Sequence, residues 1–167
     1  MRSLLVLALA AVVIPAHASQ VIFAVGQWAA LDRGGRCEAA TRSLRVASKG
    51  KVQARAGFAF DSGGGRHGQF FAELSRVPRS GSTVMLTVGT QPFLLVGSGG
   101  WAWSRGPAQE TAIIAAARSA NGMRIESRDQ AGRRFVDRYL LDGAATAIDA
   151  AAAHCASAQL AKTGRRP

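Results

Sequence analysis

Apolar and polar residues alternate in short runs along much of the chain, and this alternation predicts β-strands. The clearest run covers residues 52–60, where every second residue from Val52 to Phe60 is apolar while Gln53 and Arg55 lie on the opposite face. Residues 37–46 fit either a strand or a short helix. Further strands are predicted over residues 21–31, 69–77, 83–88, 91–96, 101–103, 123–128 and 133–141.

Two segments carry helical signals instead. Residues 107–120 begin with Pro107, whose missing N–H costs nothing in a first helical turn. A second helix is predicted to begin near Asp142, whose carboxylate would accept a hydrogen bond from a free backbone N–H of the first turn. Ile148 and Cys155 lie seven residues apart in that segment, so they share one helix face.

These elements predict a mainly β fold with two helices, of the α+β class. Most of the strands are joined by short turns, which favours antiparallel pairing. We therefore expect an antiparallel β-sandwich or a strongly bent sheet. A single domain is predicted over residues 19–156, followed by a basic flexible tail over residues 157–167.

The first 18 residues have the pattern of a secretory signal peptide. Arg2 supplies the positive charge, residues 4–14 form a short apolar run, and the tripeptide ending at Ala18 resembles a small-x-small cleavage site. We expect cleavage between Ala18 and Ser19, with an uncleaved anchor as the alternative. No later segment has the length and apolarity of a transmembrane span. The predicted location is therefore periplasmic or secreted.

The chain has two cysteines, Cys37 and Cys155. In an exported chain they fit one disulfide, which would tie the C-terminal helix back to the start of the domain; two reduced thiols are the alternative. A bond closing a loop of this length is worth about 4–5 kcal/mol in the chain-entropy model.

The formal charge of +11 becomes +10 without Arg2, and the basic residues are nearly all arginines. Such a charge favours acidic partners, for example an acidic polymer or an anionic lipid, although a solvated, generally basic surface is the simpler explanation. No nucleic acid is expected, because the chain lacks an aromatic-and-basic signature. Alternation would align Arg124 with Arg128 and Arg134 with Arg138 on strand faces. The candidate anion-binding residues, all in one predicted hairpin, are Arg124, Arg128, Arg133, Arg134 and Arg138.

Candidate catalytic chemistry is sparse. His67 and His154 lie outside recognised metal-ligand spacings, and no G-x-S-x-G motif occurs. The glycine-rich residues 61–68 precede a predicted strand rather than a helix, which argues against a phosphate cradle. We therefore expect no catalytic residues, metal or cofactor. A hydrolase would need His67 in a cleft beside an acid and a serine, and the aromatic pair at 101 and 103 fits either packing or a ligand-stacking platform.

The order of features resembles the invasion-associated locus B family of exported bacterial proteins. The resemblance covers residues 25–155, and its most distinctive part is a closing strand that runs into an alanine-rich helix ending at Cys155. Asp142 and Ala144 stand where that closing pattern usually has Lys and an aromatic residue. The segments that carry the resemblance are residues 25–28, 36–37, 55–60, 82–93, 101–103, the helix containing Glu110, 123–128 and 137–149.

The resemblance implies a β-rich periplasmic or secreted protein and supplies no catalytic residues, and the family name implies a link to host-cell entry. Together with the residue patterns, it predicts an exported envelope protein that binds a macromolecular partner of the envelope or the host. The alternative is a module that binds a polyanion or an anionic lipid through the arginine-rich hairpin.

Overall fold

The computed structural model describes residues 19–164. The predicted signal peptide lies outside the described residues, as do residues 165–167. Neither of the two helices in the described part is long and apolar enough to cross a membrane.

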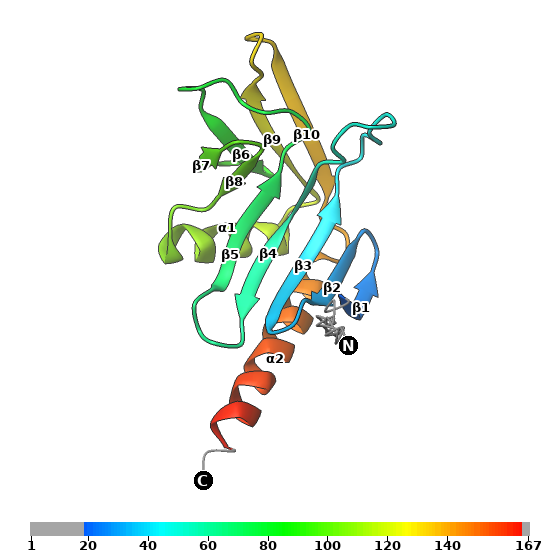
Figure 1. The fold of residues 1–167 in the computed structure, drawn as a ribbon, viewed down its shortest axis with the longest axis vertical. Coiled ribbons are helices and arrows are strands. Elements are labelled where there is room, and N and C mark those ends of the chain that lie inside the picture. The colour runs from blue at the N-terminus through cyan, green and yellow to red at the C-terminus, as the bar shows by residue number, and fades with distance from the viewer. Residues whose placement is uncertain (1–18, 165–167) are drawn as a thin grey trace, which may run out of the picture.

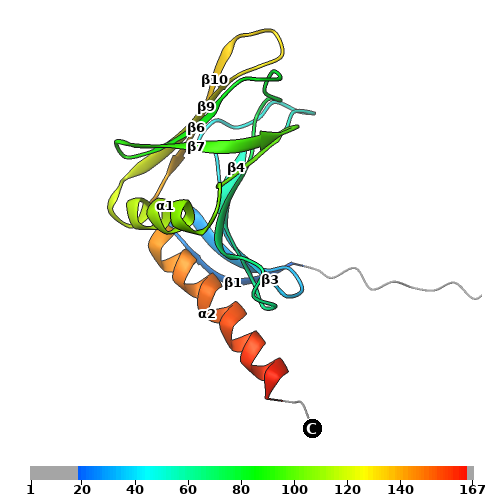
Figure 2. The same cartoon turned by 90° about the vertical axis from the view of Figure 1, so that its left-hand side faces the viewer.

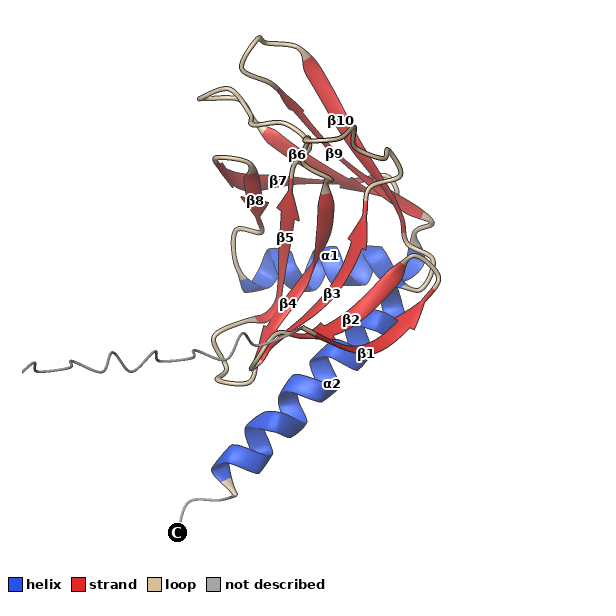
Figure 3. Cartoon of the chain, turned by 45° about the vertical axis from the view of Figure 1, so that its right-hand side comes forward, coloured by secondary structure: helices blue, strands red, loops and turns tan. Residues whose placement is uncertain are grey.

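Ten strands form one sheet, and their pairing is antiparallel, as the sequence predicts (Figures 1 and 3). Across the sheet the order is β1-β2-β3-β4-β5-β8-β7-β6-β9-β10. The strands are β1 Gln20–Val25, β2 Trp28–Asp32, β3 Arg36–Arg42, β4 Arg55–Asp61, β5 His67–Glu73, β6 Val84–Val88, β7 Gln91–Ser98, β8 Trp101–Trp103, β9 Gly122–Arg128 and β10 Arg134–Leu140.

The sheet curls until its last strand comes back to its first three. The backbone N–H of Leu44, just after β3, donates to the carbonyl of Arg138 in β10 at 2.8 Å. The indole N–H of Trp28 in β2 donates to the carbonyl of Leu140 at 2.9 Å. Figure 2 shows the same bend from the side, with both helices on one side of the long strands. The expectation of a strongly bent antiparallel sheet is therefore confirmed.

Two helices cover one face of the curled sheet. Helix α1, Pro107–Ser119, buries Ile113, Ala116 and Ala117. Helix α2, Ala144–Thr163, packs against β1 to β4 and buries Ile148 and Cys155 on its sheet-facing side, as the helical spacing predicts. The core they close is continuous from Trp28 at one side of the sheet to Ile125 in β9.

Several boundaries differ from the sequence prediction; strand β4, for example, begins at Arg55 rather than Val52. Residues 21–31 form two strands rather than one, because Gly26 takes a φ of +55° and turns the chain between β1 and β2. Gly143, not Asp142, precedes α2, and no side chain caps the helix. Helix α2 also continues to Thr163, where the sequence suggested a tail from residue 157.

Gly143 explains why the predicted Asp142 cap is absent. Its φ is +86°, a conformation that suits glycine. A Cβ at this position would lie 2.2 Å from the carbonyl oxygen of Val25. The chain therefore passes too close to the β1–β2 turn for any larger residue, and the Asp142 carbonyl accepts from the backbone N–H of Gln27 instead.

Candidate functional site

A cleft of about 580 Å³ opens at the end of the curled sheet that is far from α2. We call it the open-end cleft. It forms where the chain between β3 and β4, the chain after β5 and the β9–β10 turn meet beside β10. Its lining is Arg45, Val46, Ala47, Ser48, Lys51, Val52, Ala54, Ser75, Arg76, Val77, Asp129, Gln130, Ala131, Arg133 and Asp137.

Three valines give the cleft an apolar rim. Val46 is 84 % exposed, and Val52 and Val77 are each 48 % exposed. Leu44, next to the cleft, is also exposed. Scattered apolar residues are ordinary on a surface, but a group of them around one hollow is typical of a binding site.

Two cations of the cleft are paired with a carboxylate, and two are not. Arg76 donates to the carboxylate of Asp129 at 2.8 Å, and Arg133 approaches the same carboxylate at 3.2 Å. Arg45 and Lys51 have no carboxylate partner within residues 19–164. These two side chains therefore bring uncompensated positive charge to the apolar rim.

Both acids of the cleft are buried and engaged in structural contacts. Asp129 also accepts hydrogen bonds from the backbone N–H groups of Ala131 and Arg133. Burial tends to raise its pKa, but the hydrogen bonds from Arg76 and Arg133 outweigh that effect and hold the pKa below its usual value. The carboxylate is thus kept ionised, and it pins the β9–β10 turn to the chain after β5.

Asp137 lies on the inner face of β10 and is only 2 % exposed. Its Oδ2 accepts a hydrogen bond from the backbone N–H of Ser75 at 3.0 Å. Two residues along the same face, the hydroxyl of Tyr139 is buried without a hydrogen-bond partner. Burial, together with the charge of Asp137, raises the pKa of Tyr139 far above its usual value.

The predicted arginine-rich hairpin divides between two places. The pairing of β9 with β10 sets Arg128 opposite Arg134 and Arg124 opposite Arg138, so these four side chains share the outer face. Arg133 stands apart, because it lies in the turn and lines the cleft.

A glutamate partly neutralises this face. Glu126 pairs with Arg124 at 2.7 Å and with Arg134 at 2.8 Å. The hydrogen bonds from Arg134 and Arg124 hold the pKa of Glu126 below its usual value. Arg128 and Arg138 have no carboxylate partner in the described part of the chain, so the face keeps a net positive charge.

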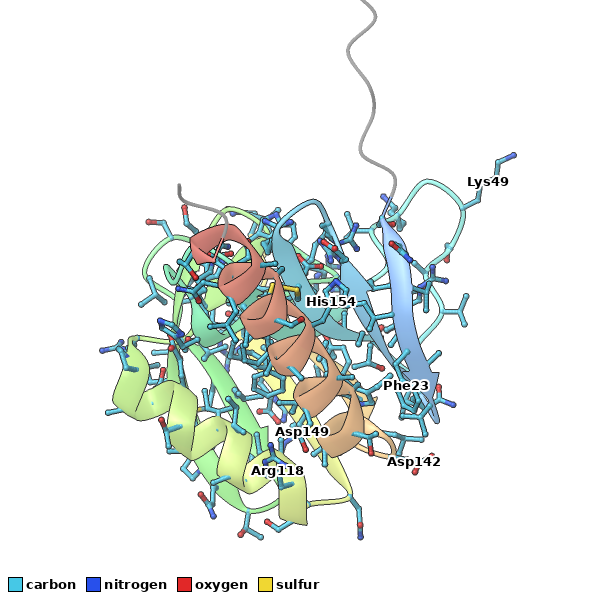
Figure 4. The ribbon with its side chains drawn as sticks, turned by 90° about the horizontal axis from the view of Figure 1, so that it is seen from below. Phe23, Lys49, Arg118, Asp142, Asp149 and His154 are labelled. Carbon is cyan, nitrogen blue, oxygen red and sulfur yellow. A yellow bond between two sulfur atoms is a disulfide. The ribbon has the colours of Figure 1, made fainter. Side chains whose placement is uncertain are left out.

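Cys37 and Cys155 form the predicted disulfide, with Cα atoms 5.8 Å apart. Figure 4 shows it beneath α2, beside His154. The Nε2 of His154 lies 3.1 Å from the carboxylate of Asp32 at the end of β2. The adjacent histidine and cysteine are thus both engaged in holding α2 against the sheet.

His67 begins β5 and is exposed, and its ring makes no hydrogen bond or ion pair with any residue between 19 and 164. The arrangement that a His67-based hydrolase requires does not occur there. Within the same range no cluster of three or more His, Cys, Asp or Glu side chains is arranged to hold a metal ion.

The aromatic pair of β8 is largely engaged by its neighbours. The rings of Trp101 and Trp103 stack at 6.4 Å. The guanidinium of Arg55 lies over Trp101 at 5.1 Å and over Phe71 at 5.4 Å. Arg55 also pairs with Glu73 at 2.9 Å. Of the two uses predicted for these tryptophans, this geometry favours packing.

Sequence reasoning missed the open-end cleft. Its lining residues are separated by up to about ninety positions and meet only because the sheet curls. The one local signal is the pair of exposed valines, Val46 and Val52, on either side of the polar turn at residues 48–51. The alternating pattern instead places Val52 at the start of a strand. Comparison of the chain with protein-family models, with curated proteins and with solved structures finds no match.

Proposed function

We propose that this protein is an exported, non-enzymatic binding protein that holds a macromolecular partner in its open-end cleft. The observation that carries the proposal is the uncompensated charge of Arg45 and Lys51 beside the exposed valines of the rim. An apolar rim with a few polar groups suits recognition. The two buried acids of the cleft are already engaged in structural contacts, so the groups left for a partner are cations and apolar side chains.

The place of action that we propose is the periplasm or the cell surface. A disulfide between Cys37 and Cys155 is the kind of bond that persists in an oxidising compartment. The leader-like first 18 residues support export. The resemblance to the invasion-associated locus B family supports the same location, and a role in contact with a host remains part of the proposal.

Retention of envelope components tests this function. The disulfide-bonded protein is immobilised and exposed to an envelope extract, beside a variant carrying Arg45→Ala and Lys51→Ala. A charge-matched control carries Arg42→Ala and Lys49→Ala, which alter exposed cations outside the cleft lining; Figure 4 shows Lys49 on the projecting loop. We expect the wild type and the control to retain the same component and the cleft variant to lose at least about tenfold of it. A wild-type protein that retains nothing specific would contradict the proposal.

The outer face of the hairpin supports a second candidate, a polyanion- or anionic-lipid-binding module. Its supporting observation is the alignment of Arg124, Arg128, Arg134 and Arg138 on one face with a single glutamate among them. Binding to vesicles containing phosphatidylglycerol should weaken steeply with salt and with Arg128→Ala plus Arg138→Ala. Vesicle binding that is unchanged by salt would exclude this candidate.

A further inference from the structure

Backbone hydrogen-bonding groups on the free edge of β10 have partners along only half of the strand. Strand β10 pairs with β9 on one side and with no strand on the other. On that free side the carbonyl of Leu140 accepts from the Trp28 indole, and the carbonyl of Arg138 accepts from the Leu44 N–H. The second half of the edge is therefore covered by β2 and by the chain after β3.

The first half of the edge is open. Successive residues of a strand point their backbone groups to opposite sides. The carbonyl of Arg133 and the N–H of Leu141 both bond toward the β9 side, so odd-numbered residues face β9 and even-numbered residues face outward. The N–H and C=O groups of Val136 and Arg134 therefore point away from β9, and residues 19–164 supply no partner for them on that side.

The open half of the edge borders the open-end cleft. Arg133, in the β9–β10 turn, and Asp137, in β10, lie on either side of these two residues and line the cleft. Across the cleft lie Arg45 and Val46, which follow directly after Leu44. The N–H of Leu44 thus bonds to β10 as the first residue of an additional strand would. The chain then turns away, and the space beside Arg134 and Val136, where such a strand would continue, is left empty.

We propose that an extended acidic peptide segment of the partner occupies this place as an added strand beside β10. This inference rests on the proposed binding function and names the partner's chemistry. The backbone of such a segment would pair with the outward groups of Val136 and Arg134 and continue the ladder that Leu44 begins. Side chains of an added strand alternate between the two faces of the sheet. Acidic side chains at every second position then lie on the outer face beside Arg134, and apolar ones face the valine rim.

Charge selects this occupant over a second copy of the chain. Charged side chains along an edge normally prevent pairing between like molecules. An identical β10 would bring arginines beside Arg134 and Arg138, which opposes pairing. The same arginines, with the uncompensated Arg45 and Lys51, attract a segment of opposite charge.

Backbone methylation of a peptide tests the inference directly. The probe is a fluorescent Glu-Val-Glu-Val-Glu peptide, compared by anisotropy with an analogue methylated at its three central backbone nitrogens. Both have the same charge and side chains, but the analogue lacks the donors that a strand needs. We expect the parent peptide to bind and the analogue to bind at least about tenfold more weakly, since the methyl groups remove the one or two N–H donors that face β10 and crowd its edge.

A pair of variants at Val136 provides the matching test on the protein. Val136→Pro removes the outward N–H at the middle of the open edge, and proline is tolerated where that N–H does not serve the sheet. Val136→Ala changes the same side chain and keeps the N–H. We expect Val136→Pro to weaken the parent peptide about tenfold or more and Val136→Ala to stay within about twofold of wild type. If Val136→Pro does not fold, the methylated peptide decides the question alone.

The outcomes separate this inference from the proposed function. Equal binding of the parent and methylated peptides would overturn strand addition. If Val136→Pro folds and binds the parent peptide as tightly as wild type, charge alone holds the ligand and strand addition is equally overturned. In both cases retention of an envelope component through Arg45 and Lys51 would leave the binding function standing. A protein that retains neither the peptide nor any envelope component would overturn both.

Discussion

The two ends of the curled sheet are built in opposite ways. At the α2 end a disulfide, an indole hydrogen bond and close contact between Gly143 and Val25 hold the layers together. At the cleft end, a single backbone hydrogen bond from Leu44 joins β10 to the chain after β3, and three valines are exposed. The contrast indicates that rigidity is concentrated where α2 closes the core, so the other end is available for a partner.

The largest expected loss of stability comes from removing the disulfide, and it tests whether the two ends are independent. Replacing both Cys37 and Cys155 with alanine should lower the free energy of unfolding by about 2–5 kcal/mol, because the unfolded chain regains the freedom of a 118-residue separation. Urea unfolding followed by circular dichroism measures the loss. Variants that remain folded should bind the acidic peptide with wild-type affinity, since the cleft lies at the other end. A large loss of affinity in folded variants would show that the two ends are coupled.

The next effect compares two glycines with similar backbone conformations. Gly143 has a φ of +86° and Gly50, beside the cleft, a φ of +76°. A Cβ at residue 143 would meet the Val25 carbonyl, whereas nothing lies within 4 Å of one at residue 50. Gly143→Ala should therefore cost about 2–4 kcal/mol and Gly50→Ala about 1–2 kcal/mol, the cost of the left-handed conformation alone. Equal losses of unfolding free energy in urea would mean that the contact with the Val25 carbonyl adds no cost beyond that of the backbone conformation.

A smaller effect depends on pH at the α2 end. Arg118 of α1 and Asp149 of α2 face one another in Figure 4 and form an ion pair. The hydrogen bond from Arg118 holds the pKa of Asp149 below its usual value. The stabilisation that this ion pair contributes is therefore complete above the unfolded-state pKa of about 3.9 and is lost as the pH falls through the lower folded-state pKa.

Asp149→Asn should cost less than about 1 kcal/mol at pH 7, because both side chains are exposed. The difference from wild type should shrink as the pH falls towards about 2, because protonation of Asp149 removes the ion pair. Asp142→Asn is the control, since it removes an exposed carboxylate that has no ion pair within residues 19–164. Urea unfolding at the two pH values measures the difference, and an Asp149→Asn effect that persists at pH 2 would rule out the ion pair as its cause.

The smallest effect concerns Tyr139, which lies between the two ends. Its buried hydroxyl has no hydrogen-bond partner, so removing that group leaves no donor or acceptor unsatisfied. Tyr139→Phe should leave stability unchanged or raise it by up to about 1 kcal/mol, as measured by thermal unfolding. A destabilisation above about 1 kcal/mol would show that the hydroxyl is hydrogen-bonded in solution.

The sequence predicts the α2 end of the sheet better than the cleft end, for physical reasons. Two cysteines in a chain with a leader-like start suggest one bond, and helical spacing places Ile148 and Cys155 on a single face. The Asp142 cap fails because local preference cannot show that the chain must pass close to Val25. The cleft is invisible because Arg45 and Asp137 become neighbours only through the curl of the sheet, which no local pattern encodes.

The hairpin shows both the success and the limit of strand alternation. Alternation correctly aligns Arg124 with Arg128 and Arg134 with Arg138. It says nothing about which backbone edge stays unpaired, because that depends on whether Leu44 or Trp28 reaches β10. The open edge at Val136 therefore follows only from the three-dimensional hydrogen-bond pattern.

The position of the disulfide also sets an order of events during biosynthesis. Cys37 lies in the third strand, but its partner lies in the last helix, 118 residues later. The thiol of Cys37 must therefore wait, unpaired, until nearly the whole described chain has been made and α2 has docked. An oxidised Cys37–Cys155 pair therefore reports a chain that has been made at least as far as α2, since a chain truncated before Cys155 leaves Cys37 without its partner.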